Sequence, residues 1–181
     1  MRWQASILLV AILLHGCAWY VYDATNRPIA VHIVGKCFAL RENAILSEHF
    51  SPYTGYFLNL AGADTCTPQE VTSTTKDKER YKAHGLRVPE CAWVPVANVA
   101  KGTEITVTKV TEQPYGGPGR CWKVEVKIMT GSFAGITADV PACLFDFPDS
   151  VLWLRTTSSH EYIEPLELSG RIAIPCIEHG D

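Results

Sequence analysis

The sequence has no excess of basic residues. It holds 16 Lys and Arg against 19 Asp and Glu, which gives a formal net charge of −3, and its pI is near 6.1. The basic residues are scattered along the chain and form no stripe that could neutralise a row of phosphates. We therefore expect no nucleic acid among the partners of this protein.

Metal-site and nucleophile motifs are also absent from the sequence. The chain contains no C-x-x-C and no H-E-x-x-H, two patterns that common zinc sites use. No G-x-S-x-G elbow presents a serine, and the S-D-N and K-T-G motifs of penicillin-binding enzymes are missing. These absences predict a protein without a metal, a cofactor or catalytic residues.

Two short clusters nevertheless keep an enzymatic alternative open. Ser73 and Lys76 form S-x-x-K, which we interpret as part of a solvated polar segment because its partner motifs are missing. Ser159, His160 and Glu161 are the residue types of a Ser-His-acid site. Neighbours on one loop rarely have the geometry that such a site needs, so we interpret this cluster as an exposed turn.

No charged residue occurs in residues 3–22. Arg2 precedes the apolar run 7–14 and the small residue Gly16 follows it, an order typical of a secretory signal. Residues 3–22 are also long enough, at a helical rise of about 1.5 Å per residue, to span a bilayer core of roughly 30 Å. This segment therefore has three interpretations: an uncleaved anchor at 3–22, a plain cleaved signal, and a signal that ends in a lipid anchor. All three send the chain after Asp23 across the membrane.

The end of the apolar run resembles the lipobox of bacterial lipoproteins. Leu14, Gly16 and Cys17 match its Leu-x-Gly-Cys pattern, whereas His15 stands where a small residue is usual. The resemblance implies that residues 1–16 are a removed signal peptide and that Cys17 carries the lipid. The resemblance also implies that the protein is located in the bacterial cell envelope, anchored on the periplasmic side or in the outer membrane.

Seven cysteines are an odd number for an exported protein. Lipidation of Cys17 would remove the odd one and leave six that could form three disulfides, which an oxidising compartment favours. These six are Cys37, Cys66, Cys91, Cys121, Cys143 and Cys176. Their spacing selects none of the many connectivities that six cysteines allow.

Strand patterns dominate the rest of the chain. Residues 121–129 alternate apolar and charged side chains with a period of two, and residues 103–110 are β-branched and nearly alternating. Further strand-like runs occur at 29–34, 55–60, 151–155 and 166–174, the last of which we expect to be a hairpin that turns near Gly170. The predicted fold class is all-β.

The predicted organisation has three parts behind the N-terminal segment. An N-terminal β portion at 28–66 is followed by residues 67–86, which carry helix-capping signals but weak helix formers and predict a polar linker or a short helix. A β domain follows at 87–181. Within it, residues 94–147 resemble a bacterial SH3-like barrel: a Gly turn, the strand "CWKVEVKI", and a second Gly turn before a strand that ends in Val-Pro. The resemblance implies a small SH3-like barrel with additional strands.

The loop "QPYGGPGR" contains the best candidate binding residues, Tyr115 and Arg120, because Gly and Pro would hold them at a loop tip. We expect an exported, membrane-tethered binding or adaptor protein whose ligand is an envelope protein, a peptide or peptidoglycan. Two alternatives are an envelope hydrolase that acts on peptidoglycan or protein, and an inhibitor or immunity protein.

The intact mass of the membrane-extracted protein tests the N-terminal interpretation. We expect a chain that starts at Cys17, carries acyl mass, and is about 6 Da lighter than its fully reduced form because three disulfides are present. A chain that starts at or near Met1 without added lipid would contradict the lipoprotein interpretation and leave a cysteine unpaired.

Overall fold

The computed structural model describes six stretches of the chain, residues 21–49, 55–60, 93–114, 120–143, 151–157 and 161–177. Within these stretches no residue is helical, and the strands belong to one nine-stranded sheet. The predicted all-β fold class is therefore confirmed. The resemblance to SH3-like barrels stays a prediction.

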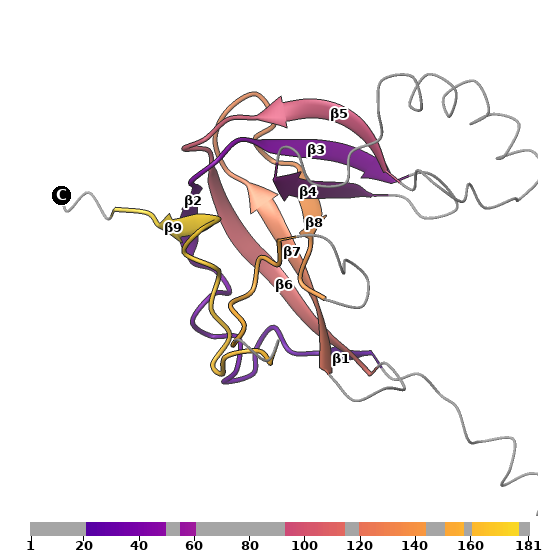
Figure 1. Cartoon of the computed structure of the whole chain (residues 1–181), viewed down its shortest axis with the longest axis vertical. Helices are drawn as coiled ribbons and strands as arrows, with labels where there is room; N and C mark the ends of the chain where they lie inside the picture. The colour runs from indigo at the N-terminus through magenta and orange to yellow at the C-terminus, as the bar shows by residue number, and fades with distance from the viewer. Residues whose placement is uncertain are drawn as a thin grey trace, which may run out of the picture.

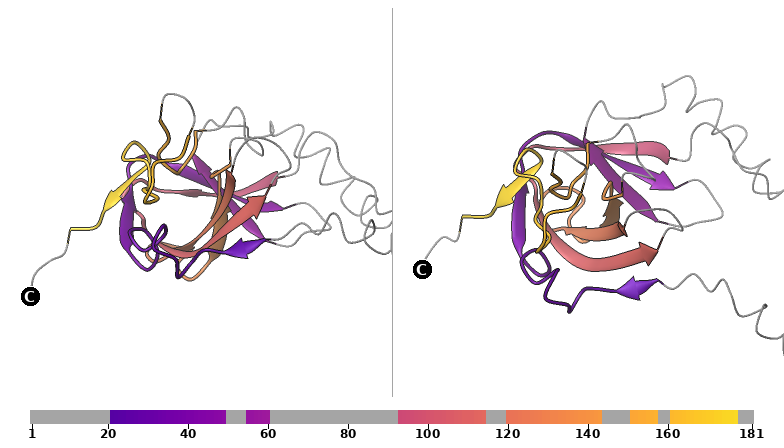
Figure 2. Two further views of the ribbon diagram at one scale, coloured as in Figure 1. Left: turned by 90° about the horizontal axis from the view of Figure 1, so that it is seen from below. Right: turned by 60° about the horizontal axis from the view of Figure 1, so that its bottom comes forward.

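The strands are numbered in chain order (Figure 1). They are β1 (Tyr22–Asp23), β2 (Cys37–Leu40), β3 (Ala44–His49), β4 (Tyr56–Leu60), β5 (Trp93–Val99), β6 (Glu104–Pro114), β7 (Arg120–Ile128), β8 (Thr137–Val140) and β9 (Ala173–Pro175). Their order in the sheet is β5-β3-β4-β8-β7-β6-β2-β9, and β1 pairs with β6 beyond this path. Only β4 and β8 pair in parallel among these strands. Figure 2 shows the sheet curling into a half-barrel.

The two longest strands, β6 and β7, form the ribbon at the centre of this sheet. Trp122, Val124, Val126 and Ile128 of β7 are buried, as their alternation predicts. The register of β6 shifts between Val107 and Lys109, and this irregularity places one extra residue in the strand. The inward face of β6 therefore changes from odd to even positions along the strand.

The concave side of the sheet is covered by stretches that lack long strands, residues 24–33 from the N-terminal portion and residues 151–157 and 161–173 from the later portion. Ala30 and Ile33 come from the first stretch, and Trp153 and Leu166 come from the later ones. All of them belong to the same hydrophobic cluster as the inward side chains of β2 to β8. The N-terminal and later β portions thus share one core.

The strand predicted at 29–34 is wrong. This segment consists of consecutive turns, in which the Ala30 N–H donates to Arg27 O (2.9 Å) and the Ile33 N–H donates to Ala30 O (3.1 Å). Ala30 and Ile33 are buried, so burial repeats every third residue instead of every second. The apolar residues of this run therefore belong to turns that pack on the sheet.

The hairpin predicted at 166–174 is also not formed as expected. The chain turns where predicted, with the Ile172 N–H donating to Ser169 O (2.9 Å). The two arms, however, pair with different partners: Leu168 bridges Leu154, and β9 pairs with β2. The segment 151–155 likewise contributes one isolated bridge, at Leu154, instead of a continuous strand.

Two disulfides are present in the described residues, which confirms a disulfide-stabilised fold. Cys37 on β2 is bonded to Cys176 just after β9, with 5.4 Å between their Cα atoms. Cys121 on β7 is bonded to Cys143 beyond β8, with 5.0 Å between their Cα atoms. The remaining cysteines lie outside the described residues: Cys17, Cys66 and Cys91. A third disulfide therefore stays a prediction.

Other predicted segments also lie outside the described residues. These are residues 1–20, which include the lipobox and most of the alternative anchor, and residues 67–86. In the part of the chain that is described, no helix has the length and apolarity to cross a membrane.

Replacing Trp153 tests the shared core. Its side chain is fully buried, so we expect Trp153→Ala to lower the free energy of unfolding by about 3–5 kcal/mol. Val96 is 53% exposed on β5, and Val96→Ala should stay within about 0.5 kcal/mol of wild type. Urea denaturation of the oxidised proteins, followed by circular dichroism, measures both. Equal stability of the two variants would show that Trp153 does not anchor the core.

Candidate functional site

A cavity of about 620 Å³ lies at one end of the β6–β7 ribbon. Four of its lining residues are apolar: Pro28, Ile29, Trp122 and Pro165. Four are charged or titratable: Arg27, His32, Glu112 and Glu164. The volume falls in the range of roughly 300–1,000 Å³ that is typical of ligand sites, and such sites combine apolar walls with a few polar groups.

Strand pairing builds one wall of this cavity. Tyr22 of β1 lies opposite Glu112 of β6, which in turn lies opposite Trp122 of β7, so the three residues are neighbours in one row across the sheet. The Arg27 guanidinium carbon lies 5.7 Å from the centre of the Tyr22 ring, a cation–π contact. This contact holds the guanidinium at the edge of the wall.

The segment 161–166 builds the opposite wall. The Tyr162 ring meets Trp122 edge to face, with 6.5 Å between the ring centroids, and its hydroxyl donates to Ala142 O (2.7 Å). The Leu166 N–H donates to Ile29 O (2.8 Å). These contacts bring residues 164–165 beside residues 28–29, and together they border an open depression.

A short polar turn positions the segment that carries Arg27. The Thr25 N–H donates to the Asp23 carboxylate (2.9 Å), and the Thr25 hydroxyl accepts from the Val110 N–H (3.1 Å). Hydrogen bonds from the Thr25 side chain and backbone hold the pKa of Asp23 below its ordinary value. The turn is thus favoured above that ordinary pKa and weakens as the pH falls through the lowered one.

A second, smaller cavity of about 230 Å³ lies on the outer face of β6, β7 and β8. Three of its four charged side chains, those of Lys123, Glu125 and Asp139, have partners in the protein. Lys123 Nζ lies 2.9 Å from Asp139 Oδ2, and Glu125 accepts from the Thr108 hydroxyl (2.8 Å). Its volume is below the range typical of ligand sites, which makes it the weaker candidate.

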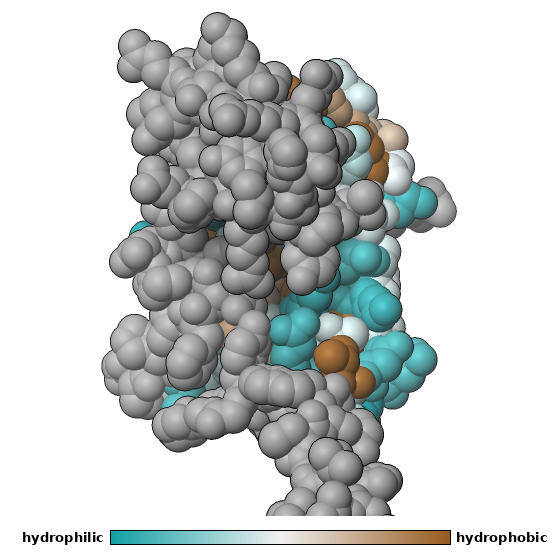
Figure 3. Space-filling model, turned by 90° about the vertical axis from the view of Figure 1, so that its right-hand side faces the viewer, coloured by the Kyte–Doolittle hydropathy of each residue, from teal (hydrophilic) through white to brown (hydrophobic). Residues whose placement is uncertain are grey.

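The surface seen in Figure 3 shows where apolar residues are exposed on one side of the molecule. Among the described residues on that face, hydrophilic residues form a band and hydrophobic ones are confined to small areas. The described residues on that face therefore form no broad apolar surface.

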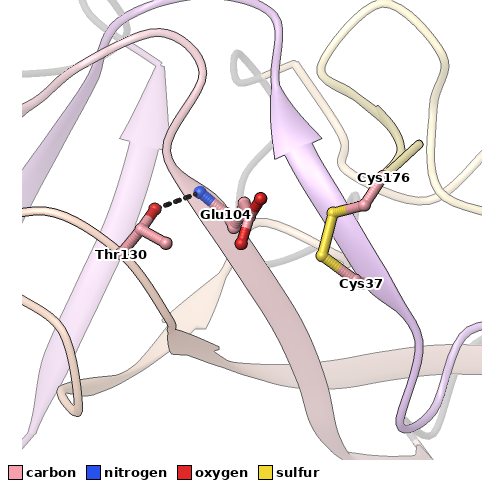
Figure 4. The surroundings of a disulfide bond; sticks show 4 residues. All are labelled: Cys37, Glu104, Thr130 and Cys176. Atoms are coloured by element: carbon pink, nitrogen blue, oxygen red, sulfur yellow. Dashed lines mark hydrogen bonds between the residues drawn. A yellow bond between two sulfur atoms is a disulfide. The ribbon is translucent and has the colours of Figure 1, made fainter. Parts of the chain in front are cut away.

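One group of possible metal ligands occurs in the described residues, and it includes the Cys37–Cys176 disulfide. The two sulfur atoms and a carboxylate oxygen of Glu104 lie within 4.8 Å of one another. Figure 4 shows the Glu104 side chain beside the disulfide, while its backbone N–H donates to the Thr130 hydroxyl (2.9 Å). Metal binding needs thiolates. The disulfide therefore excludes a metal as long as it is intact.

The residues that the sequence singled out mostly fall elsewhere. Tyr115 lies outside the described residues, and so do the Ser73–Lys76 pair and residues 158–160. Arg120 is the first residue of β7 and lies opposite Pro114. The strands on either side of that predicted loop nevertheless supply two residues of the cavity, Glu112 and Trp122.

Sequence reasoning did not identify Arg27, Glu112 or Glu164 as site residues. None of them belongs to a motif, and each comes from a different stretch of the chain. The one shared local signal is that Arg27 and Glu164 each precede a proline that also lines the cavity.

No family model, curated protein or solved structure matches the chain. The function of the cavity is therefore argued from the geometry and chemistry of the residues that form it.

Selective reduction tests the environment of the two disulfides. Cys121 and Cys143 are 1% and 2% exposed, whereas Cys37 and Cys176 are half-buried, so the second pair should be reduced first. The Glu104 carboxylate repels an attacking thiolate, and Glu104→Gln should speed that reduction roughly fourfold.

Timed reduction of the native protein, with alkylation and peptide mass spectrometry, measures both rates. The Cys121–Cys143 bond and a Glu125→Gln variant are the controls, and neither rate should change. An unchanged rate in Glu104→Gln would show that its charge does not reach the disulfide.

Proposed function

We propose that the protein is an exported, membrane-tethered binding protein of the bacterial envelope, and that the cavity at the end of the β6–β7 ribbon is its ligand site. The lipobox-like Leu14 to Cys17 supports the tether. The two disulfides in the described residues support a location in an oxidising compartment, where disulfides form and persist.

The cavity is the observation that carries the proposal. Three stretches distant in sequence, residues 27–32, the β6–β7 ribbon and residues 164–165, bring apolar walls and charges of both signs to one place. Trp122 supports the floor from beneath, since it is only 2% exposed and packs against Tyr162. Such a site is suited to a peptide or a wall fragment, which also combines apolar and charged groups.

The envelope hydrolase is the second candidate, because two carboxylates, Glu112 and Glu164, line the same cavity. Paired carboxylates are the residue types of glycoside hydrolysis. Release of labelled fragments from peptidoglycan, lost in both Glu112→Gln and Glu164→Gln, would replace the binding proposal with this one.

Retention assays test the proposed site. We expect the full-length protein in detergent to be retained on purified peptidoglycan or on an immobilised digest of envelope proteins. Glu164→Arg should lower retention at least about tenfold, because it reverses a charge and fills the cavity. Glu167→Arg is the matched control, since Glu167 pairs with Arg155 on the surface outside the cavity (2.8 Å).

Two results would contradict the proposal. One is no retention of the wild-type protein on either matrix. The other is equal retention of wild type and Glu164→Arg, which would place binding outside the cavity.

A further inference from the structure

We infer that the domain rests on the membrane with the end of the β6–β7 ribbon that carries β1, through a docking surface formed by Val21, Tyr22, Arg27 and Lys109. The partner is the phospholipid bilayer that holds the tether. This inference rests on the membrane tether of the proposed function and adds which surface of the domain faces the lipid.

The length of the tether limits how the domain can be oriented. Val21 is the first residue that the structure describes, and it comes four positions after Cys17, the lipid-bearing residue of the proposed function. Covalent geometry allows at most about 3.6 Å per residue, so the Cα atom of Val21 lies within about 14 Å of the lipidated residue. With an uncleaved anchor at 3–22, Tyr22 is at the end of the membrane span itself. Both forms of the tether place β1 next to the bilayer.

Strand pairing shows which end of the domain β1 belongs to. β1 pairs antiparallel with β6, with Asp23 opposite Thr111 and Tyr22 opposite Glu112. Going back from Asp23 to Tyr22, the chain therefore runs toward the end of β6 at Pro114. Figure 1 shows β1 at this end of the ribbon. The tether thus joins the domain at the Pro114 end of β6.

The opposite end of the ribbon is too far from the tether to be the docking end. Met129 lies at that end, where its N–H donates to Glu104 O (2.8 Å). The strand β6 runs from Glu104 to Glu112, opposite Tyr22, over a distance of about 25 Å at roughly 3.3 Å per residue. A tether of about 14 Å does not span this distance, so the domain cannot stand on the bilayer with its Met129 end.

Two exposed side chains at the β1 end suit a lipid interface. Val21 is 60% exposed and Tyr22 is 44% exposed. Tyrosine is enriched at membrane interfaces, because its ring is apolar and its hydroxyl can bind water or head groups. Two side chains are too small an area to bind a bilayer alone. A tethered domain, however, is held at a high local concentration of lipid, so a weak contact is enough to orient it.

Two cations without an ion pair lie beside these side chains. Arg27 is exposed, and its guanidinium carbon lies 5.7 Å from the centre of the Tyr22 ring. Lys109 is exposed on the outer face of β6 and lines the smaller cavity together with Val21. Neither cation forms an ion pair within the described residues. A head-group phosphate can therefore bind either of them without displacing a protein carboxylate.

The nearest carboxylates have other interactions within the protein. The Thr25 N–H donates to the Asp23 carboxylate (2.9 Å). Hydrogen bonds from Thr25, followed by the charges of Lys109 and Arg27, hold the pKa of Asp23 below its ordinary value. Glu112 also has an interaction within the protein. The hydrogen-bond donors of the two cations are thus left for the head groups.

This orientation also locates the candidate ligand cavity. Arg27 lines that cavity, and Glu112 and Trp122 line it from the same end of the ribbon. The cavity then lies next to the bilayer. Its ligand is therefore one that comes to the membrane surface.

Photocrosslinking to lipid tests the docking surface. p-Benzoylphenylalanine is placed at Val21 or at Met129, both exposed apolar residues, which lie at opposite ends of the ribbon. The full-length, membrane-extracted protein is reconstituted into vesicles of phosphatidylcholine and phosphatidylglycerol, irradiated and digested, and lipid adducts are measured by mass spectrometry. The probe at Val21 should give at least about ten times more adduct, because the docked orientation holds only this probe at the lipid.

Charge reversal separates docking from simple closeness to the tether. With the probe at Val21, Lys109→Glu should lower the adduct yield at least about fivefold, the contribution of one cation near an anionic surface. Raising the ionic strength from about 0.1 M to about 1 M should have a similar effect on the wild type, because charges are then screened. Lys101→Glu is the matched control and should change nothing, since Lys101 is an exposed cation in the turn before β6, at the other end of the ribbon.

Two results would overturn the inference. Equal adduct yields from the two probes would show that the domain has no preferred orientation. A yield at Val21 that neither Lys109→Glu nor high salt lowers would show that the tether alone brings this residue to the lipid. Flotation of the vesicles reports on the tether separately: if the protein does not float with them, the tether of the proposed function fails, whereas equal yields in a protein that floats remove only the docking surface.

Discussion

The pairing of β6 with β7 is the constraint on which the rest of the structure depends. β6 carries β2 along the first part of its free edge and β1 along the last part, while β7 carries β8. Through β8 the sheet continues to β4, β3 and β5, so every other strand is placed directly or indirectly by this ribbon. Its inward side chains are fully buried at Val110, Val124 and Val126, which ties the hydrogen-bonded ladder to the core.

The cavity follows from how this ribbon ends. The strands extend to Pro114 and Arg120, where two covering stretches meet the inward face of the ribbon over Glu112 and Trp122. The disulfides cross-link other pairs of elements: Cys37–Cys176 ties the outermost strand β9 to β2, and Cys121–Cys143, next to Trp122, ties β7 to the chain after β8. Cross-links between distant parts of the chain limit the freedom of the unfolded state, which benefits a small domain.

Local patterns predicted the ribbon but not what covers it. The alternation at 121–129 appears directly as β7, because each residue's side is set by the pleat of its own strand. The run at 29–34 is also largely apolar, yet it forms turns that pack on the sheet, and only Ala30 and Ile33 are buried. The pairing of Cys37 with Cys176 was likewise open, since it depends on β9 joining the edge of β2.

The sequence by itself determined the fold class, the two central strands and the burial of Trp122, because these depend on residues close together in the chain. The tertiary structure alone decided the disulfide partners and the cavity. Arg27, Glu112 and Glu164 have no shared spacing or motif, and they come together only because strand pairing and the covering turns fold three distant stretches onto one end of the ribbon.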